Sequence, residues 1–161
     1  MRRTFILGLI MVFAVPTAVA IAADIRGTDG PDVLSGTPAP DQILGLRGDD
    51  QINGGGERDD DIDGEACEGD CPAGTSVADR LYGEGGDDDL RGDDGRDLLS
   101  GGNGRDTLVG FGGRDRLSTG AGNDSINSRD GVRDTVNCGA GRDILRRDRA
   151  DRAVGCERLR R

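Results

Sequence analysis

Aliphatic side chains recur at every ninth position through most of this chain, each between polar neighbours. The clearest run consists of five consecutive phrases over residues 83–127, which read GEGGDDDLR, GDDGRDLLS, GGNGRDTLV, GFGGRDRLS and TGAGNDSIN. Each phrase is rich in glycine at its start, has an aspartate at its sixth position and an aliphatic residue at its eighth. A repeat of fixed period indicates a solenoid, in which each repeat stacks on its neighbours.

The same register continues on both sides of this run. Upstream phrases begin at Gly27, Gly36, Gly45 and, after one extra glycine, Gly55; downstream, a ten-residue variant covers 128–137 and a last copy begins at Cys138. The sixth-position acids are Asp32, Asp41, Asp50, Asp60, Asp88, Asp97, Asp106, Asp115, Asp124, Asp134 and Asp143. The eighth-position residues are Leu34, Ile43, Ile52, Ile62, Leu90, Leu99, Leu108, Leu117, Ile126, Val136 and Leu145.

The phrase itself predicts a tight turn followed by a very short strand. Its glycines permit positive φ and close backbone approach over the first six residues. The last three residues form a strand whose middle, aliphatic side chain points inward. Two phrases then make one coil, so each phrase lies over the next but one, and stacked strands pair in parallel about 4.8 Å apart. We therefore expect an all-β fold, a parallel β-solenoid of about six coils.

This register divides the chain into segments. The roll is expected over 24–146, with an irregular loop at 64–78 that ends just before the repeat-like Asp79-Arg80-Leu81-Tyr82, and a cap or tail over 147–161. We interpret the irregular stretch as one turn that carries a loop, not as a domain boundary.

Stacking the phrases places their aspartates in rows along each edge of the roll, for example Asp88, Asp106 and Asp124 along one edge. Rows of carboxylates repel one another unless a cation lies between them. Calcium suits this position because it takes about six to eight oxygen ligands and mixes carboxylates with backbone carbonyls, whereas magnesium requires a smaller octahedral cage. The chain has no histidine and only four cysteines, so zinc and copper sites are not expected.

Composition alone would favour a disordered chain: 29 glycines, 2% aromatic residues and a net charge of −10 are typical of disorder. The strict phase of the aliphatic residues argues against that interpretation. However, one aliphatic side chain per nine residues buries little surface against the entropy of ordering the backbone. We therefore predict that folding is coupled to calcium binding.

The phrases resemble the calcium-binding nonapeptides of the RTX, or hemolysin-type, family. The resemblance covers nearly all of residues 25–146 and implies that the solenoid is a right-handed parallel β-roll of about six coils, with calcium between successive turns and a C-terminal cap. It implies that the sixth-position aspartates, from Asp32 to Asp143, are calcium ligands beside turn carbonyls. The stretch from Asp130 to Glu157 resembles the capping tail of small secreted bacterial proteins of this type.

The N-terminus predicts export. Arg2-Arg3 precedes an apolar run from Phe5 to Val15, then Pro16 and the small residues Ala18-Val19-Ala20. This is the layout of a secretory signal peptide, which we assign to residues 1–23. The run is short for a membrane span, so we expect a secreted, extracellular mature chain with no span.

Four cysteines fit an oxidising compartment. Three pairings are possible, and the sequence does not choose among them. In one of them Cys67 pairs with Cys71 inside the loop, and Cys138 with Cys156 between the last coil and the tail.

The expected function is binding and not catalysis. Without histidine there is no Ser-His-Asp triad, and nearly every aspartate already has a place in the repeat. The acidic body opposes nucleic-acid binding. The sequence therefore predicts a secreted protein that binds several calcium ions and folds on binding them. The alternative is a cell-surface or matrix interaction protein, with a surface or polymer partner, in which calcium only rigidifies the roll.

Overall fold

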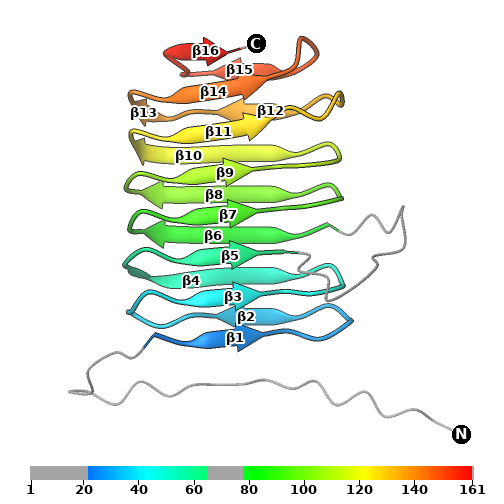
Figure 1. Cartoon of the computed structure of the whole chain (residues 1–161), viewed down its shortest axis with the longest axis vertical. Helices are drawn as coiled ribbons and strands as arrows, with labels where there is room; N and C mark the ends of the chain where they lie inside the picture. Colours follow the sequence, from blue (N-terminus) through cyan, green and yellow to red (C-terminus); the bar gives the residue numbers. More distant parts are fainter. Residues whose placement is uncertain (1–21, 65–77, 161) are drawn as a thin grey trace, which may run out of the picture.

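The computed structural model describes residues 22–64 and 78–160, and these form a straight two-sheet solenoid (Figure 1). The first sheet contains, in order, β1 (Asp24–Arg26), β3 (Gln42–Leu44), β5 (Asp61–Asp63), β7 (Asp89–Arg91), β9 (Thr107–Val109), β11 (Ser125–Ser128), β14 (Ile144–Arg147) and β16 (Arg158–Arg160). The second contains β2 (Val33–Ser35), β4 (Gln51–Glu57), β6 (Arg80–Gly85), β8 (Leu98–Asn103), β10 (Arg116–Gly122), β12 (Thr135–Asn137) and β15 (Arg152–Val154), and the short β13 (Ala140–Gly141) also pairs with β10.

Every strand pair is parallel. Each strand pairs with the strand one coil before it and the strand one coil after it in the same sheet. Leu99 of β8 pairs with Leu81 of β6 and with Leu117 of β10. Ile126 of β11 lies in the same way between Leu108 and Leu145 in the other sheet. Two phrases therefore make one coil, and the predicted all-β roll of about six coils is confirmed.

The core is a double row of aliphatic side chains between the two sheets. One residue from each phrase fills it, because strand side chains alternate between the inside and the outside of the sheet. Fully buried examples are Ile43, Ile52, Ile62, Leu81, Leu90, Leu99, Leu108, Leu117, Ile126, Val136 and Leu145. Ile25 and Leu34, in the first coil, are only partly buried, since that coil packs on described residues from one side.

Some strands are longer than the three residues expected. In the second sheet β4, β6, β8 and β10 run for six or seven residues, because the first residues of each following turn continue the pairing. Gly102, for example, lies opposite both Glu84 and Gly120. The extra glycine in β4 is absorbed as a shift of register between Asn53 and Gly56, as in a β-bulge.

The chain after residue 147 adds strands to the roll. β15 pairs with β12 and β16 with β14, so both sheets extend into this segment. A disulfide with an S–S distance of 1.98 Å joins Cys138, at the end of β12, to Cys156 between β15 and β16. Cys67 and Cys71, and the predicted signal peptide up to residue 21, lie outside the described residues. Within the described chain no helix is long and apolar enough to cross a membrane.

Candidate metal site

The sixth-position aspartates form two continuous columns, one along each turn edge of the roll. In each column the carboxylate oxygen Oδ1 accepts a hydrogen bond of 2.8–3.1 Å from the backbone amide of the aspartate one coil earlier. The first column contains Asp32, Asp50, Asp79, Asp97, Asp115, Asp134 and Asp151. The second contains Asp41, Asp60, Asp88, Asp106, Asp124 and Asp143.

The backbone fixes each of these side chains in place. The carbonyl of each column aspartate from Asp32 to Asp134 accepts the amide of the first strand residue one coil later, as when Thr107 N donates to Asp88 O at 2.7 Å. The carboxylate lies beneath its own turn and is buried: Asp50, Asp106 and Asp143 have no exposed surface. An aspartate at this position is therefore a structural part of the turn as well as a candidate ligand.

The second carboxylate oxygen has a different environment. Among the described residues, Oδ2 accepts no hydrogen bond and is buried in Asp50, Asp60, Asp88, Asp97, Asp106, Asp115, Asp124, Asp134 and Asp143. A buried polar atom without a partner is energetically unfavourable. The same oxygen lacks a partner in turn after turn of the central coils, which points to a group that binds there.

The glycine that begins most phrases packs directly against this oxygen, which leaves no room for a side chain there. A Cβ added at Gly101 would lie against Oδ2 of Asp106 and 2.8 Å from the carbonyl oxygen of Thr119 in the next coil. At Gly83 it would lie against Oδ2 of Asp88 and 2.7 Å from the Gly101 carbonyl. The carboxylate oxygen and a carbonyl oxygen of the adjacent coil thus lie close to the same point beside the glycine.

Burial also disfavours the charged form of these acids. Loss of solvation raises the pKa of Asp97 to about 8, although the amide of Asp79 donates to it and partly opposes the shift; repulsion from Asp115 adds to the rise. The same causes raise the pKa to about 7 in Asp50, Asp106 and Asp134, and to about 6 in Asp60, Asp88 and Asp115. A cation beside Oδ2 would favour the carboxylate form and lower these pKa values.

The donor set fits calcium. It consists of oxygens only, and calcium accepts carboxylate and backbone carbonyl oxygens together. Over 22–64 and 78–160 no three acidic or cysteine side chains form a ready-made metal cluster, so an ion in these turns must take several carbonyl ligands. The stacked glycine-rich turns provide them.

The terminal turns satisfy the same oxygen with protein groups. Oδ2 of Asp32 accepts the backbone amide of Thr28 at 2.6 Å and its hydroxyl at 2.9 Å. At the other end, Oδ2 of Asp151 accepts the amide of Asp148 at 2.8 Å and the hydroxyl of Ser128 at 3.1 Å. These turns have less need of a cation than the central ones.

The structure places all eleven predicted aspartates in the two columns and adds two that were not predicted. Asp79 directly follows the irregular loop, and its signal is the Asp-x-Leu order of Asp79-Arg80-Leu81. Asp151 is harder to find, because Ala153 takes the aliphatic position two residues later. Both accept a backbone amide from the preceding coil as the other column members do.

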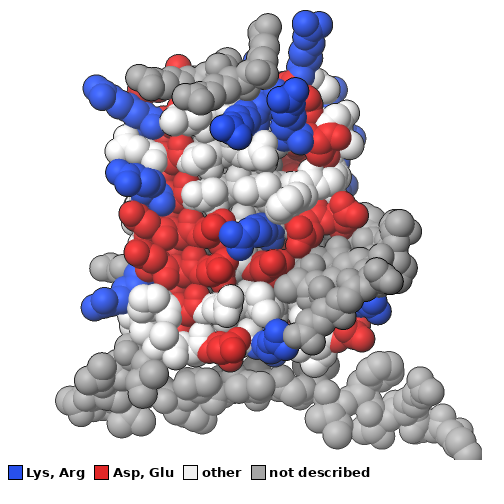
Figure 2. Space-filling model, viewed as in Figure 1, with Lys and Arg blue, Asp and Glu red and all other residues white. Residues whose placement is uncertain are grey.

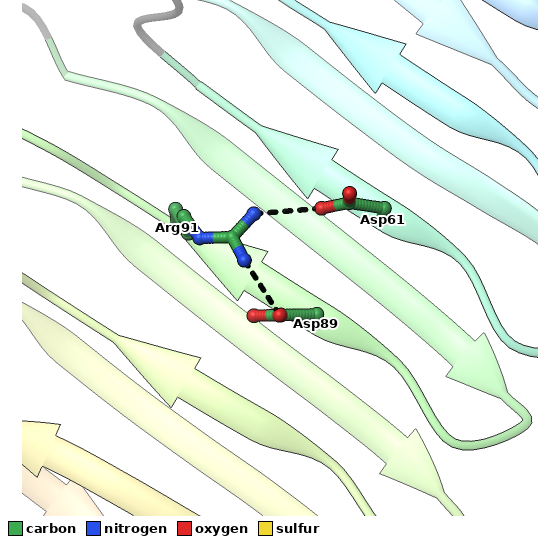
Figure 3. Close-up of polar contacts among 3 residues, drawn as sticks. All are labelled: Asp61, Asp89 and Arg91. Atoms are coloured by element: carbon green, nitrogen blue, oxygen red, sulfur yellow. Dashed lines mark hydrogen bonds and ion pairs between the residues drawn. The ribbon is translucent and has the colours of Figure 1, made fainter.

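A second acidic group lies on the outer surface of the first sheet. Arg91 bridges Asp61 at 2.7 Å and Asp89 at 2.6 Å across the neighbouring strands β5 and β7 (Figure 3). Acidic side chains gather around the middle of the visible face in Figure 2. The three bridged side chains are partly exposed, so this ion pair contributes little to stability.

Comparison with known proteins gives one match. No curated protein and no solved structure matches the chain. The family model of the RTX calcium-binding nonapeptide repeat, built on four copies, matches residues 26–61, 74–108 and 109–145, which together make up most of the chain. The phrases, the parallel roll and the oxygen-lined turns agree with this match, and the chain belongs to the RTX calcium-binding nonapeptide repeat family.

Proposed function

We propose that this protein is exported, binds several calcium ions in the turns of its roll and folds as it binds them. The observation that carries the proposal is the buried Oδ2 atom in turn after turn of the central coils, held beside carbonyl oxygens and without a hydrogen-bond partner. Membership of the RTX calcium-binding repeat family implies that the chain binds calcium. The assignment of individual ligands is ours.

The ligands are the column aspartates of the central coils, from Asp50 to Asp143, through Oδ2. The carbonyl oxygens that begin the phrases, such as those of Gly101 and Thr119, complete the set. The predicted ligands Asp32 and Asp41 are expected to bind more weakly: Thr28 donates to the first, and the Thr37 amide donates to Oδ2 of the second at 2.5 Å.

Coupling to folding follows from the balance of forces in the central coils. Each phrase buries a single aliphatic residue, and burial of two rows of carboxylates opposes the folded state at neutral pH, as the raised pKa values show. Binding to the folded state alone stabilises it by mass action. Several ions in stacked turns therefore favour the roll cooperatively.

Export brings the chain to the outside of the cell, where calcium is available to it. The sequence of residues 1–23 supports a cleaved signal peptide, and the Cys138–Cys156 disulfide suits an oxidising compartment. Extracellular calcium modules bind with dissociation constants of roughly 0.1–1 mM. We assign 24–146 to the roll, with a loop at 64–78, and 147–161 to a cap that closes its end.

Binding, and not catalysis, is the proposed role of the acidic residues. In the central turns Oδ1 accepts a backbone amide of the adjacent coil and Oδ2 is buried, so neither oxygen is accessible to a substrate. The alternative is a cell-surface or matrix interaction protein in which calcium only rigidifies the roll; the exposed side chain of Phe111, which lies outside the core, favours it.

Far-UV circular dichroism of the purified mature chain tests the proposal. After chelation, addition of calcium is expected to produce a cooperative coil-to-strand change at roughly 0.1–1 mM, and magnesium is expected not to. An unchanged spectrum, whether from a chain that is already folded or from one that stays disordered, would contradict calcium-coupled folding.

A further inference from the structure

The N-terminal end of the roll presents two strand edges and part of the core. Among the described residues β1 pairs only with β3, and β2 only with β4. Ile25 and Leu34, the inward residues of β1 and β2, are only partly buried. Their counterparts one coil later, Ile43 and Ile52, have no exposed surface. An edge of this kind is a template for pairing with another strand.

The backbone of β1 directs alternate residues to its two sides. The first hydrogen bond between β1 and β3 is accepted by the carbonyl of Ala23 from the amide of Gln42, at 2.9 Å. Because alternate residues of a strand bond to opposite sides, Ile25 also bonds to β3. The amides and carbonyls of Asp24 and Arg26 therefore point away from β3, toward the open edge.

The strand β2 has the same alternation. The carbonyl of Asp32 accepts the amide of Gln51 at 2.9 Å, so Leu34 bonds to β4. The amides and carbonyls of Val33 and Ser35 therefore point toward the open edge. In both strands the residues that direct their backbone to this edge have exposed side chains, and the residue between them points its side chain into the core.

These two edges complement each other when they belong to two copies of the chain. In an antiparallel pair centred on Ile25 of one copy and Leu34 of the other, the flanking residues form hydrogen-bonded pairs and the central residues a close, non-hydrogen-bonded pair. Both central side chains then lie in a continuous core. The flanking pairs are Asp24 with Ser35 and Arg26 with Val33, so no like charges face each other.

The step between the strands selects this arrangement. The coil rises continuously, so β2 lies above β1 by about half of the coil spacing, roughly 2.4 Å (Figure 1). Pairing β1 with the partner's β2, twice, closes both sheets at one strand spacing. Pairing β1 with the partner's β1 would close the first sheet and leave a gap in the second. Joining the N-terminal end to the C-terminal end would also leave a gap, because the first sheet ends at β16 and the second half a coil earlier at β15.

We propose that two copies of the mature chain associate through their N-terminal ends as a two-fold dimer, in which β1 of each copy pairs antiparallel with β2 of the other. Closed two-fold interfaces are self-complementary, as these edges are. This inference rests on the proposed cleavage of residues 1–23, which makes β1 the start of the mature chain. The interface contains about a dozen residues a side (24–35), fewer than the roughly 20–30 of a standard interface, so the dimer should be weak, with a micromolar Kd.

The test uses a charge placed at the interface and its reversal. Ser35→Asp puts a carboxylate opposite Asp24 of the partner at both contacts, and Asp24→Arg/Ser35→Asp converts each contact into an ion pair. The matched control is Ser100→Asp, since Ser100 is also the third residue of its strand in the second sheet, but in β8 between β6 and β10. Sedimentation velocity over a concentration series measures Kd in saturating calcium, after circular dichroism shows that each variant is folded.

Ser35→Asp is expected to raise Kd by about fivefold or more, because like charges directly opposite each other destabilise a sheet. The double variant should return to within about threefold of the wild type, and Ser100→Asp should stay within about twofold. A folded wild type that is monomeric at about 100 μM, species larger than a dimer, absence of rescue, or equal effects of the two Ser→Asp changes would each overturn the proposal.

Intact mass of the exported chain separates this result from a failure of the proposed function. A chain that keeps residues 1–23 would contradict the cleavage, and with it the basis of the dimer. A chain that is cleaved and folds with calcium but remains monomeric would contradict the dimer alone.

Discussion

In the central turns, such as those of Asp97 and Asp106, one carboxylate oxygen accepts an amide from the adjacent coil and the other accepts no hydrogen bond. In the terminal turns the same second oxygen accepts an amide and a hydroxyl, from Thr28 at one end and from Asp148 and Ser128 at the other. The aspartate at the sixth position of the phrase thus has one of two environments. In the terminal turns a neighbouring hydroxyl donates to its second oxygen, and in the central turns no group does.

The difference separates two ways of closing a turn. A terminal turn is complete with protein groups alone, whereas a central turn keeps a buried, charged oxygen that requires a cation or a proton. The C-terminal end has a further restraint in the Cys138–Cys156 disulfide. The central coils, which form most of the roll, should therefore depend most strongly on calcium.

The largest expected difference between central and terminal coils is in the stability lost when a side chain of the hydrophobic core is removed. Leu99→Ala removes a fully buried side chain between two other coils and should lower the free energy of unfolding by about 2–5 kcal/mol in saturating calcium. Leu34→Ala, in the first coil, removes a side chain that is only partly buried and should have a clearly smaller effect. Urea denaturation of both variants measures this, and equal losses would show that the first coil is as tightly packed as the centre.

Removal of the disulfide should weaken the C-terminal end. Cys138→Ser/Cys156→Ser opens a loop closed across a separation of 18 residues and should lower the free energy of unfolding by about 3 kcal/mol. Thermal unfolding in calcium, with limited proteolysis after the arginines of β14 to β16, reports the change. A tail that remains resistant would mean that strand pairing alone holds this end.

The central turns also predict a dependence on pH. Their folded-state pKa values, about 8 for Asp97 and about 7 for Asp50, lie above the ordinary value of 3.8, so folding favours the protonated acids. For the calcium-free chain this contribution is fully present below about pH 4 and is lost as the pH rises through about 6 to 8. The calcium-free chain should therefore contain more strand at pH 5 than at pH 8.

Calcium binding should show the opposite trend. Protons and calcium compete for the carboxylates, so the calcium midpoint should shift to higher concentration when the pH is lowered from 8 to 6. For each proton displaced, the apparent affinity changes by about tenfold per pH unit below the folded pKa. A midpoint independent of pH would contradict the binding of calcium by the buried carboxylates of the central turns.

The smallest expected effect concerns the two turn edges. Phe111→Gly relieves a left-handed conformation that costs about 1–2 kcal/mol, less the 0.5–1 kcal/mol or so of glycine's greater entropy in the unfolded chain, so the variant should be slightly more stable. Gly102→Ala, at the equivalent position of the other edge, should destabilise, because its Cβ would meet the carbonyl of Glu84 at a φ of 121°. Differential scanning calorimetry compares them; stabilisation by both changes would contradict this account of the turns.

The repeat was sufficient to predict the fold and both aspartate columns because a fixed period specifies which residues stack. Its limits appear where the period fails: Asp79 follows the loop, and Asp151 is followed by Ala153 in place of a larger aliphatic residue. The hydroxyls of Thr28 and Ser128 that complete the terminal turns were not predicted, since their contacts depend on three-dimensional position. The length of β4, β6, β8 and β10 also could not be predicted, because it arises from pairing between stacked turns.

Calcium binding by calorimetry tests the central claim most directly. The wild type is titrated beside Asp97→Asn, which alters a central turn, and Asp32→Asn, which makes the same change in a turn completed by Thr28. Both substitutions keep a side-chain oxygen able to accept the amide. The account predicts that Asp97→Asn binds fewer tightly held calcium ions per chain than the wild type and that Asp32→Asn, whose turn binds calcium only weakly, binds the same number of them. An undiminished number of ions in Asp97→Asn, or an equal loss in both variants, would contradict it.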